Sequence, residues 1–90
     1  MPYFSVIVPV YNRRSEVSDL MQSLAGQSDK DFEAIIVEDG STERCQDIVE
    51  KYTGAVDCRY YWKENEGRSI ARNYGIERAR GQYFIFFDSD

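Results

Sequence analysis

Four short apolar runs are spaced along the chain, and polar residues follow each of them. The runs cover residues 4–10, 32–37, 58–62 and 82–87. Runs of this length that are rich in β-branched and aromatic side chains are typical of strands. The last run ends in an unbroken apolar stretch, a pattern that predicts a strand buried on both faces.

Between these runs the apolar residues recur at helical spacing, which predicts three amphipathic helices. The stripes are Val17, Leu20, Met21 and Leu24 in the first, Cys45, Ile48, Val49 and Tyr52 in the second, and Ile70, Ala71, Tyr74 and Ala79 in the third, over residues 69–79. We expect Gly26, Gly54 and Gly81 to end these helices, one glycine each. Ser41 or Thr42 is expected to cap the start of the second helix.

The predicted elements alternate along the chain, beginning and ending with a strand. Strands that alternate with helix-length crossovers form parallel sheets with right-handed connections. At 90 residues the chain is one domain at most. The sequence therefore predicts a three-layer α/β/α fold over residues 1–90, with a parallel sheet of about four strands.

Composition narrows the range of functions. The net charge of −5 argues against a nucleic-acid partner, which would require a basic surface. Cys45 and Cys58 have neither a metal-site spacing nor a CxxC spacing, and we interpret them as reduced thiols of a cytoplasmic protein. No apolar stretch approaches the ~20 residues of a membrane span. Because histidine is absent, a general base would have to be a carboxylate, a tyrosine, a lysine or a perturbed cysteine.

A polar cluster follows each predicted strand. The clusters are residues 9–12, 38–41, 65–67 and 88–90. We expect them to converge, because the carboxyl ends of parallel strands meet at the sheet edge where open α/β folds bind ligands. Asp88 and Asp90 offer two hard oxygen donors that suit Mg²⁺ or Mn²⁺, and such an ion suits a diphosphate. The alternative is an ordinary polar turn, in which Asp and Ser are common.

Two further residues are candidates for nucleotide contacts. Asp39 can accept hydrogen bonds from a ribose or a base edge at the exit of the second strand. Its alternative role is local, in the tight turn that leads to the second helix. Arg72 lies near the start of the third helix, whose unpaired N–H groups attract anions, and can add a contact to phosphate. The alternative for Arg72 is a solvated helix face shared with Arg68 and Arg78, and for Arg78 we adopt that interpretation.

Several motifs, in their order along the chain, resemble those of the family-2 glycosyltransferases. They are residues 6–12, 37–42, 65–67, 71–75, Gly81 and 87–90. The resemblance covers essentially the whole chain and implies the amino-terminal, nucleotide-sugar-binding portion of a GT-A-type fold. It also implies transfer of a sugar from a nucleotide-diphosphate donor, metal-assisted and with inversion, in polysaccharide biosynthesis.

The resemblance implies a role for each matching residue. Nucleotide binding falls to Pro9, Tyr11, Asp39, Arg72 and Asp88, and metal ligation to Asp88 and Asp90 of the DxD motif. Within this scheme Asp39 contacts the base and Asp90 coordinates the Mg²⁺ or Mn²⁺ on the diphosphate. The family most often has a second Asp where this chain has Glu38, a departure that we expect to affect local packing only. No residue of the chain is assigned as the catalytic base.

Family members continue past the DxD motif into a half that binds the acceptor and supplies the catalytic base. We therefore expect the chain to be truncated after that motif and to lack transferase activity unaided. We also expect self-association through apolar surface near Phe84, Phe86 and Phe87. The resemblance implies a UDP-sugar donor and an acceptor that is a sugar, a lipid carrier or a polysaccharide, in the cytoplasm or at the inner face of the membrane.

Two other functions fit parts of the pattern. One is a non-catalytic nucleotide-binding or regulatory module of the same fold. The other is a nucleotidyltransferase-like enzyme, which shares the need for a metal and a diphosphate. Enzymes of that kind usually have a Gly-rich, basic loop after the first strand, and residues 9–14 of this chain are not Gly-rich.

Overall fold

Strands and helices alternate in the predicted order in residues 2–87, which the computed structural model describes. The strands are β1 (Phe4–Val10), β2 (Phe32–Asp39), β3 (Cys58–Lys63) and β4 (Tyr83–Phe86), and the helices are α1 (Arg14–Ala25), α2 (Gln46–Glu50) and α3 (Arg68–Arg78). All paired strands are parallel, and their order across the sheet is β3-β2-β1-β4. The structure therefore confirms the predicted α/β sheet.

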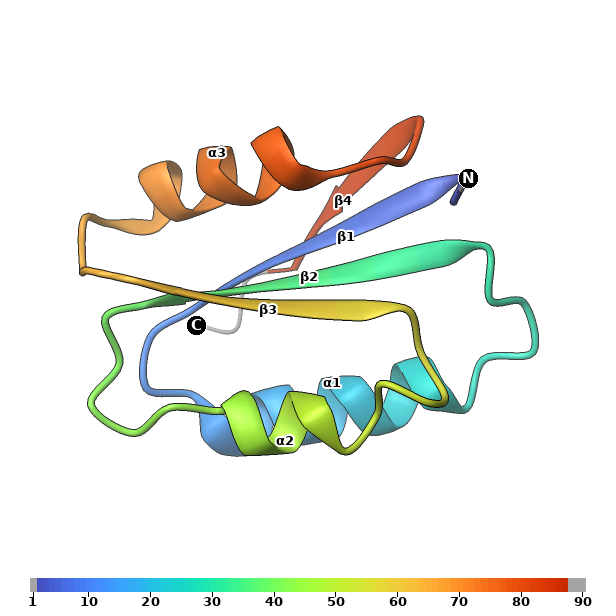
Figure 1. Cartoon of the computed structure of the whole chain (residues 1–90), viewed down its shortest axis with the longest axis horizontal. Coiled ribbons are helices and arrows are strands. Elements are labelled where there is room, and N and C mark those ends of the chain that lie inside the picture. The colour runs from blue at the N-terminus through green and yellow to red at the C-terminus, as the bar shows by residue number, and fades with distance from the viewer. Residues whose placement is uncertain (1, 88–90) are drawn as a thin grey trace.

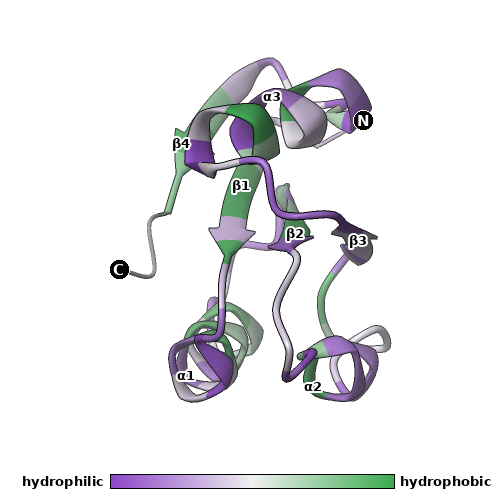
Figure 2. Cartoon of the chain, turned by 90° about the vertical axis from the view of Figure 1, so that its left-hand side faces the viewer, coloured by the Kyte–Doolittle hydropathy of each residue, from purple (hydrophilic) through white to green (hydrophobic). Residues whose placement is uncertain are grey.

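Helices cover both faces of the sheet, with α1 and α2 on one side and α3 on the other (Figure 1 and Figure 2). Successive residues of β1 and β2 enter two separate cores, because side chains alternate along a strand. Val8 and Ile36 belong to the core shared with α1 and α2, whereas Ile7 and Ile35 belong to the core shared with α3. A Cβ at Gly75 would lie 2.7 Å from Ile7 Cγ2, so α3 packs directly against β1.

The predicted glycine stops are correct for one helix and wrong for two. α1 ends directly before Gly26. α2 ends well before Gly54, and α3 ends before Gly81 because Ala79 already has extended dihedral angles. Gly81 serves another purpose, since a Cβ there would lie 2.6 Å from Ser5 Oγ where the chain passes over β1.

The predicted cap of α2 is also wrong. The N-cap residue is Cys45, and its N–H donates to the Glu38 carboxyl group at 2.7 Å. Ser41 Oγ instead accepts the Asn12 N–H at 2.8 Å, and Thr42 Oγ1 bonds to the Asn12 side chain at 3.2 Å. The start of α2 is therefore held by a side chain of β2 rather than by the residues just before the helix.

β4 lies at an edge of the described sheet and pairs with β1. Tyr83 is 54% exposed and Phe87, which follows the strand, is 39% exposed, with the residues between them in the same range. The prediction that this strand is buried on both faces is wrong for the described structure, because α3 packs on β1 and β2 instead.

Two expectations from composition can be compared with the structure. Cys45 and Cys58 are both free thiols, and Cys45 is fully buried on the apolar stripe of its segment, as predicted. None of the helices in residues 2–87 has the length and apolar character that crossing a membrane requires.

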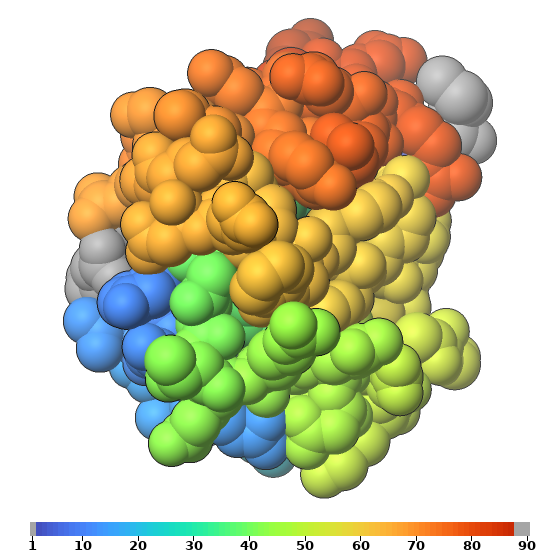
Figure 3. Space-filling view, turned by 60° about the vertical axis from the view of Figure 1, so that its left-hand side comes forward, coloured from blue at the N-terminus to red at the C-terminus, as the bar shows by residue number. Residues whose placement is uncertain are grey.

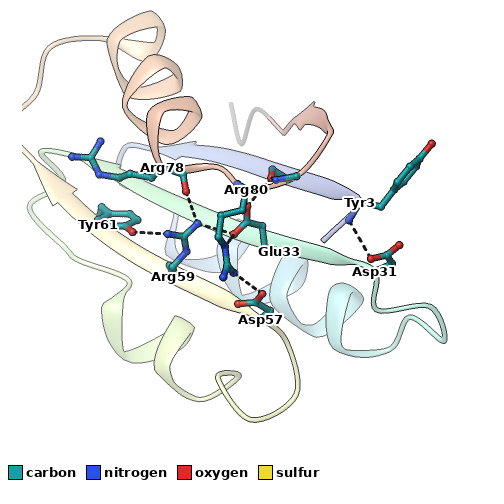
Figure 4. Close-up of polar contacts among 10 residues, drawn as sticks. Tyr3, Asp31, Glu33, Asp57, Arg59, Tyr61, Arg78 and Arg80 are labelled. Carbon is teal, nitrogen blue, oxygen red and sulfur yellow. Dashed lines mark hydrogen bonds and ion pairs between the residues drawn. The ribbon is translucent and has the colours of Figure 1, made fainter. Parts of the chain in front are cut away.

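A buried ionic cluster joins the strands at their amino-terminal ends (Figure 4). Glu33 is fully buried, and its Oε2 accepts from Ser5 Oγ at 2.7 Å and from the Arg80 N–H at 2.6 Å. Its Oε1 accepts from Arg59 Nη2 at 2.7 Å and from Arg80 Nε at 3.1 Å. Arg80 Nη2 also pairs with Asp57 at 2.9 Å. Burial raises the pKa of Glu33, but the bonds from Arg80, Ser5 and Arg59 outweigh burial and lower the pKa to about 2.

Candidate functional site

A pocket of about 230 Å³ opens at the carboxyl-terminal edge of the sheet. It is lined by Pro9, Val10, Tyr11, Asp39, Asn65, Gly67 and Arg68. The segments that follow β1, β2 and β3 meet on this side of the molecule, where they are blue, green and yellow to orange (Figure 3). Three of the four predicted polar clusters therefore converge, and the fourth, residues 88–90, lies outside the described residues.

Asp39 fixes one wall of the pocket. It is the last residue of β2 and is only 5% exposed. Its Oδ1 accepts the Glu66 N–H at 2.9 Å and its Oδ2 accepts the Gly67 N–H at 3.0 Å. Lys63 Nζ lies 3.6 Å from Oδ1. Because a carboxylate has about four acceptor positions, these two bonds leave acceptor capacity for a ligand.

Asn12 fastens the exit of β1 to the exit of β2. Its side-chain Oδ1 accepts from Thr42 N at 3.0 Å and from Glu43 N at 3.3 Å. Asn12 has a φ of 52°, a left-handed conformation that Asn adopts more readily than most residues. Sequence reasoning placed Asn12 in a polar cluster but gave it no role. The signal that could have found it was an Asn two residues after a strand.

Gly40 lets two of the exit loops touch. Its φ is +77°, and a Cβ there would lie 2.6 Å from Asn65 N and 2.8 Å from Asn65 Cβ. A side chain at this position would therefore be strained and would also push Asn65 away. The approach of the two loops depends on glycine at position 40.

Glu38 reaches to the opposite side of the sheet from Asp39. It is fully buried, and its Oε1 accepts from Cys45 N at 2.7 Å and from Tyr60 Oη at 2.6 Å. Burial, together with the bond to Glu38, raises the pKa of the Tyr60 hydroxyl. Burial and the same carboxyl group raise the pKa of the Cys45 thiol. Both groups therefore keep their protons at neutral pH.

Pro9, Tyr11 and Asp39, three of the predicted nucleotide-binding residues, lie together on the pocket. Pro9 is buried, whereas Tyr11 exposes 48% of its surface. Arg72 does not line this pocket, and its guanidinium carbon lies 5.5 Å from the centre of the Phe86 ring. The remaining predicted nucleotide contact, at Asp88, lies outside the described residues.

Arg68 and Arg78 lie in different surroundings, and only Arg78 departs from the solvated helix face. Arg68 lines the pocket from the first turn of α3. Arg78 is half-buried, and its guanidinium carbon lies 3.4 Å from the centre of the Tyr74 ring and 5.3 Å from that of Tyr61. The interpretation of Arg78 as a solvated side chain is therefore wrong, because stacking on two tyrosine rings covers its cationic group.

The predicted metal ligands, Asp88 and Asp90, both lie outside the described residues. Among residues 2–87 no group of three or more His, Cys, Asp or Glu side chains is arranged to hold a metal ion. Within residues 2–87 the site is therefore a pocket lined by one buried acid, Asp39, and one cationic side chain, Arg68, without a metal centre.

A model of glycosyl transferase family 2 matches residues 5–90 of the chain. TuaG of Bacillus subtilis (strain 168) is 44% identical to this chain over 92 residues. Its name gives it a provisional role as a glycosyltransferase of teichuronic acid biosynthesis. That alignment covers 99% of this chain and 36% of TuaG. The chain thus spans about a third or less of the length of the first relatives it matches.

Solved structures share the fold. The crystal structure of Staphylococcus aureus TarS 1–349 in complex with UDP-GlcNAc is similar with a TM-score of 0.88 and 38% identity. The match covers 98% of this chain and 26% of that one. The mannosyltransferase PcManGT from Pyrobaculum calidifontis, in complex with GDP-Man and Mn²⁺, has a TM-score of 0.85 at 22% identity, over 99% of this chain and 28% of its own. These neighbours confirm the GT-A-type fold.

Proposed function

The chain belongs to glycosyl transferase family 2, and on that premise we propose that it forms the donor-binding part of an enzyme that transfers sugars. The donor is a nucleotide diphosphate sugar, and residues 1–90 form the part of the enzyme that binds the nucleotide of this donor. The observation that carries this proposal is the pocket at the carboxyl-terminal edge, where Pro9, Tyr11 and Asp39 come together. That edge is where open α/β sheets bind nucleotides.

Each predicted nucleotide-binding residue has a distinct role in this proposal. The Asp39 carboxylate accepts an N–H of the base, and the exposed ring of Tyr11 offers a face on which a base can stack. Pro9 shapes the floor beside them. Arg72 contributes positive charge on the nucleotide side of α3, and Asp88 contacts the ribose.

A divalent ion completes the donor site in the proposed enzyme. Asp88 and Asp90 would hold Mg²⁺ or Mn²⁺, and the bound ion would supply Lewis-acid stabilisation of negative charge on the diphosphate. The Mn²⁺ and GDP-Man in the structurally similar PcManGT support this assignment. The acceptor hydroxyl attacks from the opposite face of the sugar, with inversion, and the base that takes its proton is not assigned to this chain. The chain unaided is therefore expected to bind donor without transferring sugar.

Similar proteins support a proposal for the partners. TarS is named a poly(ribitol-phosphate) beta-N-acetylglucosaminyltransferase and has been solved with UDP-GlcNAc, so we assign a UDP-sugar as donor. The acceptor is a polysaccharide, a sugar or a lipid carrier. The free thiols favour a reducing compartment, and we place the reaction in the cytoplasm or at the inner face of the membrane. The exposed surface of β4 makes self-association an additional expectation.

Calorimetric titration of UDP into the chain, with and without Mn²⁺, tests the proposed function. Tyr11→Ala removes a pocket ring, and Tyr3→Ala removes a ring of similar exposure at the other edge of the sheet. We expect Mn²⁺-dependent binding that Tyr11→Ala and Asp90→Ala weaken and Tyr3→Ala leaves unchanged. Tyr11 is a cleaner probe than Asp39, because Asp39→Ala also releases the loop of Glu66.

Three results would count against the donor site. They are no UDP binding by the folded chain, equal binding by all variants, or binding that does not respond to Mn²⁺. Donor binding by a longer protein that includes this chain but shows no sugar transfer would favour the alternative, a non-catalytic nucleotide-binding module.

A further inference from the structure

Two acids stand side by side at the end of β2 and serve different partners. Glu38 and Asp39 are consecutive, so their side chains point to opposite faces of the sheet. Asp39 faces the pocket and accepts from the backbone that follows β3. Glu38 faces the other core and accepts from Cys45 and Tyr60. Glu38 thus contacts the start of α2 and β3 on one face of the sheet, and Asp39 contacts the loop after β3 on the other.

The Glu38 carboxyl group is a demanding group to bury. One oxygen, Oε1, accepts hydrogen bonds from both the Cys45 N–H and the Tyr60 hydroxyl. The other, Oε2, is buried without a hydrogen-bond partner among residues 2–87. No ion pair joins Glu38 to a cation within that range. A buried oxygen without a donor opposes folding, whereas an apolar residue at this position would avoid that cost but leave the Cys45 N–H and the Tyr60 hydroxyl without their acceptor. The carboxyl group at position 38 is therefore explained by its two donors, Cys45 and Tyr60.

The positions of its two donors suggest what the acid does. Cys45 stands at the start of α2 and Tyr60 lies within β3, three residues before Lys63. β3 leads directly into the loop whose Glu66 N–H is held by Asp39. Glu38 therefore ties the exit of β2 to β3 on the side away from the pocket. Asp39 then ties it to the end of the same loop on the pocket side.

We propose that Glu38 is a positioning residue of the pocket. Through Tyr60 and Cys45 it holds the end of β2 in place, and so holds the Asp39 carboxylate where it meets Glu66 and Gly67. Its effect on nucleotide binding rests on the proposed function, whereas its effect on the geometry of the pocket does not. Glu38 itself does not touch the pocket, so its influence passes through the backbone of β2.

Amide hydrogen exchange measured by NMR tests this directly. The amides of Glu66 and Gly67 report whether Asp39 still holds them, with or without nucleotide. In Tyr60→Phe and Glu38→Gln we expect their exchange to be on the order of tenfold faster, since Tyr60→Phe removes the hydroxyl that donates to Glu38 and Glu38→Gln replaces the carboxyl group with a weaker, neutral acceptor. UDP affinity, measured on the same samples, is expected to fall several-fold.

Two control variants separate positioning from general destabilisation. Tyr52→Phe removes another hydroxyl beside the same core and is expected to leave both amides and the UDP affinity unchanged. Val17→Ala cuts into the core at α1 and lowers global stability. Because the two loop amides exchange through local opening, we expect Val17→Ala to leave their exchange unchanged.

The possible outcomes are distinguishable. Unchanged exchange at Glu66 and Gly67 in both Tyr60→Phe and Glu38→Gln overturns the positioning role, whether or not UDP binds. Faster exchange with unchanged UDP affinity overturns its relevance to the nucleotide. Faster exchange in a chain whose wild type does not bind UDP supports the positioning role and contradicts the proposed function instead. If Glu38→Gln fails to fold, Tyr60→Phe still decides the matter.

Discussion

The two ends of β2 carry buried acids in opposite circumstances. At the amino-terminal end, Glu33 accepts four bonds from Ser5, Arg59 and Arg80, and its pKa is lowered to about 2. At the carboxyl-terminal end, Asp39 accepts two bonds from backbone N–H groups and lies beside a pocket of about 230 Å³. Both acids are almost inaccessible to solvent, and Asp39 itself lines the pocket at the carboxyl-terminal edge.

The comparison separates a stabilising cluster from a binding site. The cluster around Glu33 satisfies its acid with cations of the same chain and leaves it no evident capacity for a ligand. Asp39 instead accepts from two loop amides, with Lys63 Nζ 3.6 Å from its Oδ1, and it keeps acceptor capacity on the side of the pocket. In a parallel sheet the loops at the carboxyl-terminal edge are thus free to form a site, provided that the other edge fixes the strands.

Replacement of Glu33 is expected to have the largest effect. Glu33→Ala leaves Arg59 and Arg80 without their buried partner and should lower the free energy of unfolding by about 3–4 kcal/mol. We choose the lower part of the range for buried pairs because both arginines are partly exposed. Urea unfolding measures the change, with Glu77→Ala, an exposed acid on α3, as control. A loss below about 1 kcal/mol would place the cluster among ordinary surface pairs.

Acid should remove the same contribution in the wild type. Glu33 has a lowered pKa in the folded chain, so its contribution is complete above about pH 4.5 and is lost as the pH falls toward 2. The lowering of the pKa from 4.5 to about 2 corresponds to roughly 3.4 kcal/mol at most. We therefore expect the stability difference between wild type and Glu33→Gln to shrink from pH 6 to pH 2. A difference that stays constant over this interval would contradict the lowered pKa.

Glycine replacements at the two edges should have contrasting effects. Gly40→Ala strains a residue with φ of +77° and pushes Asn65 away, which we expect to destabilise by about 2 kcal/mol and to weaken UDP binding. Gly81→Ala crowds Ser5 at the opposite edge and should lower stability without changing UDP affinity in the folded fraction. Thermal unfolding and calorimetry on both variants measure this. Equal effects on UDP affinity would remove the functional difference between the edges.

The smallest predicted effect concerns β4, the open side of the sheet. Ile85→Lys places a charge on this strand, and Ile70→Lys places the same charge at a residue of α3 with similar exposure. If β4 mediates self-association, Ile85→Lys should weaken the association by about 1 kcal/mol and Ile70→Lys should not. Light scattering over a range of concentrations compares them. A wild type that stays monomeric at high concentration would rule out this contact.

The sequence was sufficient for the order of elements, because the strand runs and helical stripes are local patterns. It also placed Pro9, Tyr11 and Asp39 correctly at one edge, since that follows from parallel topology. It failed for β4, because an apolar run reports what a strand can bury and not what lies over it in the described chain. Asp88, a further predicted contact, lies outside the described residues.

Long-range polar contacts were beyond the reach of sequence reasoning. Glu33 stands in an apolar run, and its partners Arg59 and Arg80 lie 26 and 47 residues further along the chain. The start of α2 was missed for a similar reason, because the N–H of its N-cap residue, Cys45, is held by Glu38 of the preceding strand, while Ser41 bonds to Asn12. Pairings of this kind depend on strand register, which local patterns do not specify.

The Glu33 cluster also has a consequence for biosynthesis. The Arg80 N–H that bonds to Glu33 lies 47 residues downstream, and the Gly81 N–H that bonds to Ser5 lies 76 residues downstream. A chain emerging from the ribosome therefore exposes β1 and β2 well before the groups that satisfy their polar residues have been translated. Since contacts this distant in sequence slow folding, we expect β1 and β2 not to form a stable sheet on nascent chains that lack residues 80 and 81. We expect the sheet to become stable only once the segment after α3 has left the ribosomal exit tunnel.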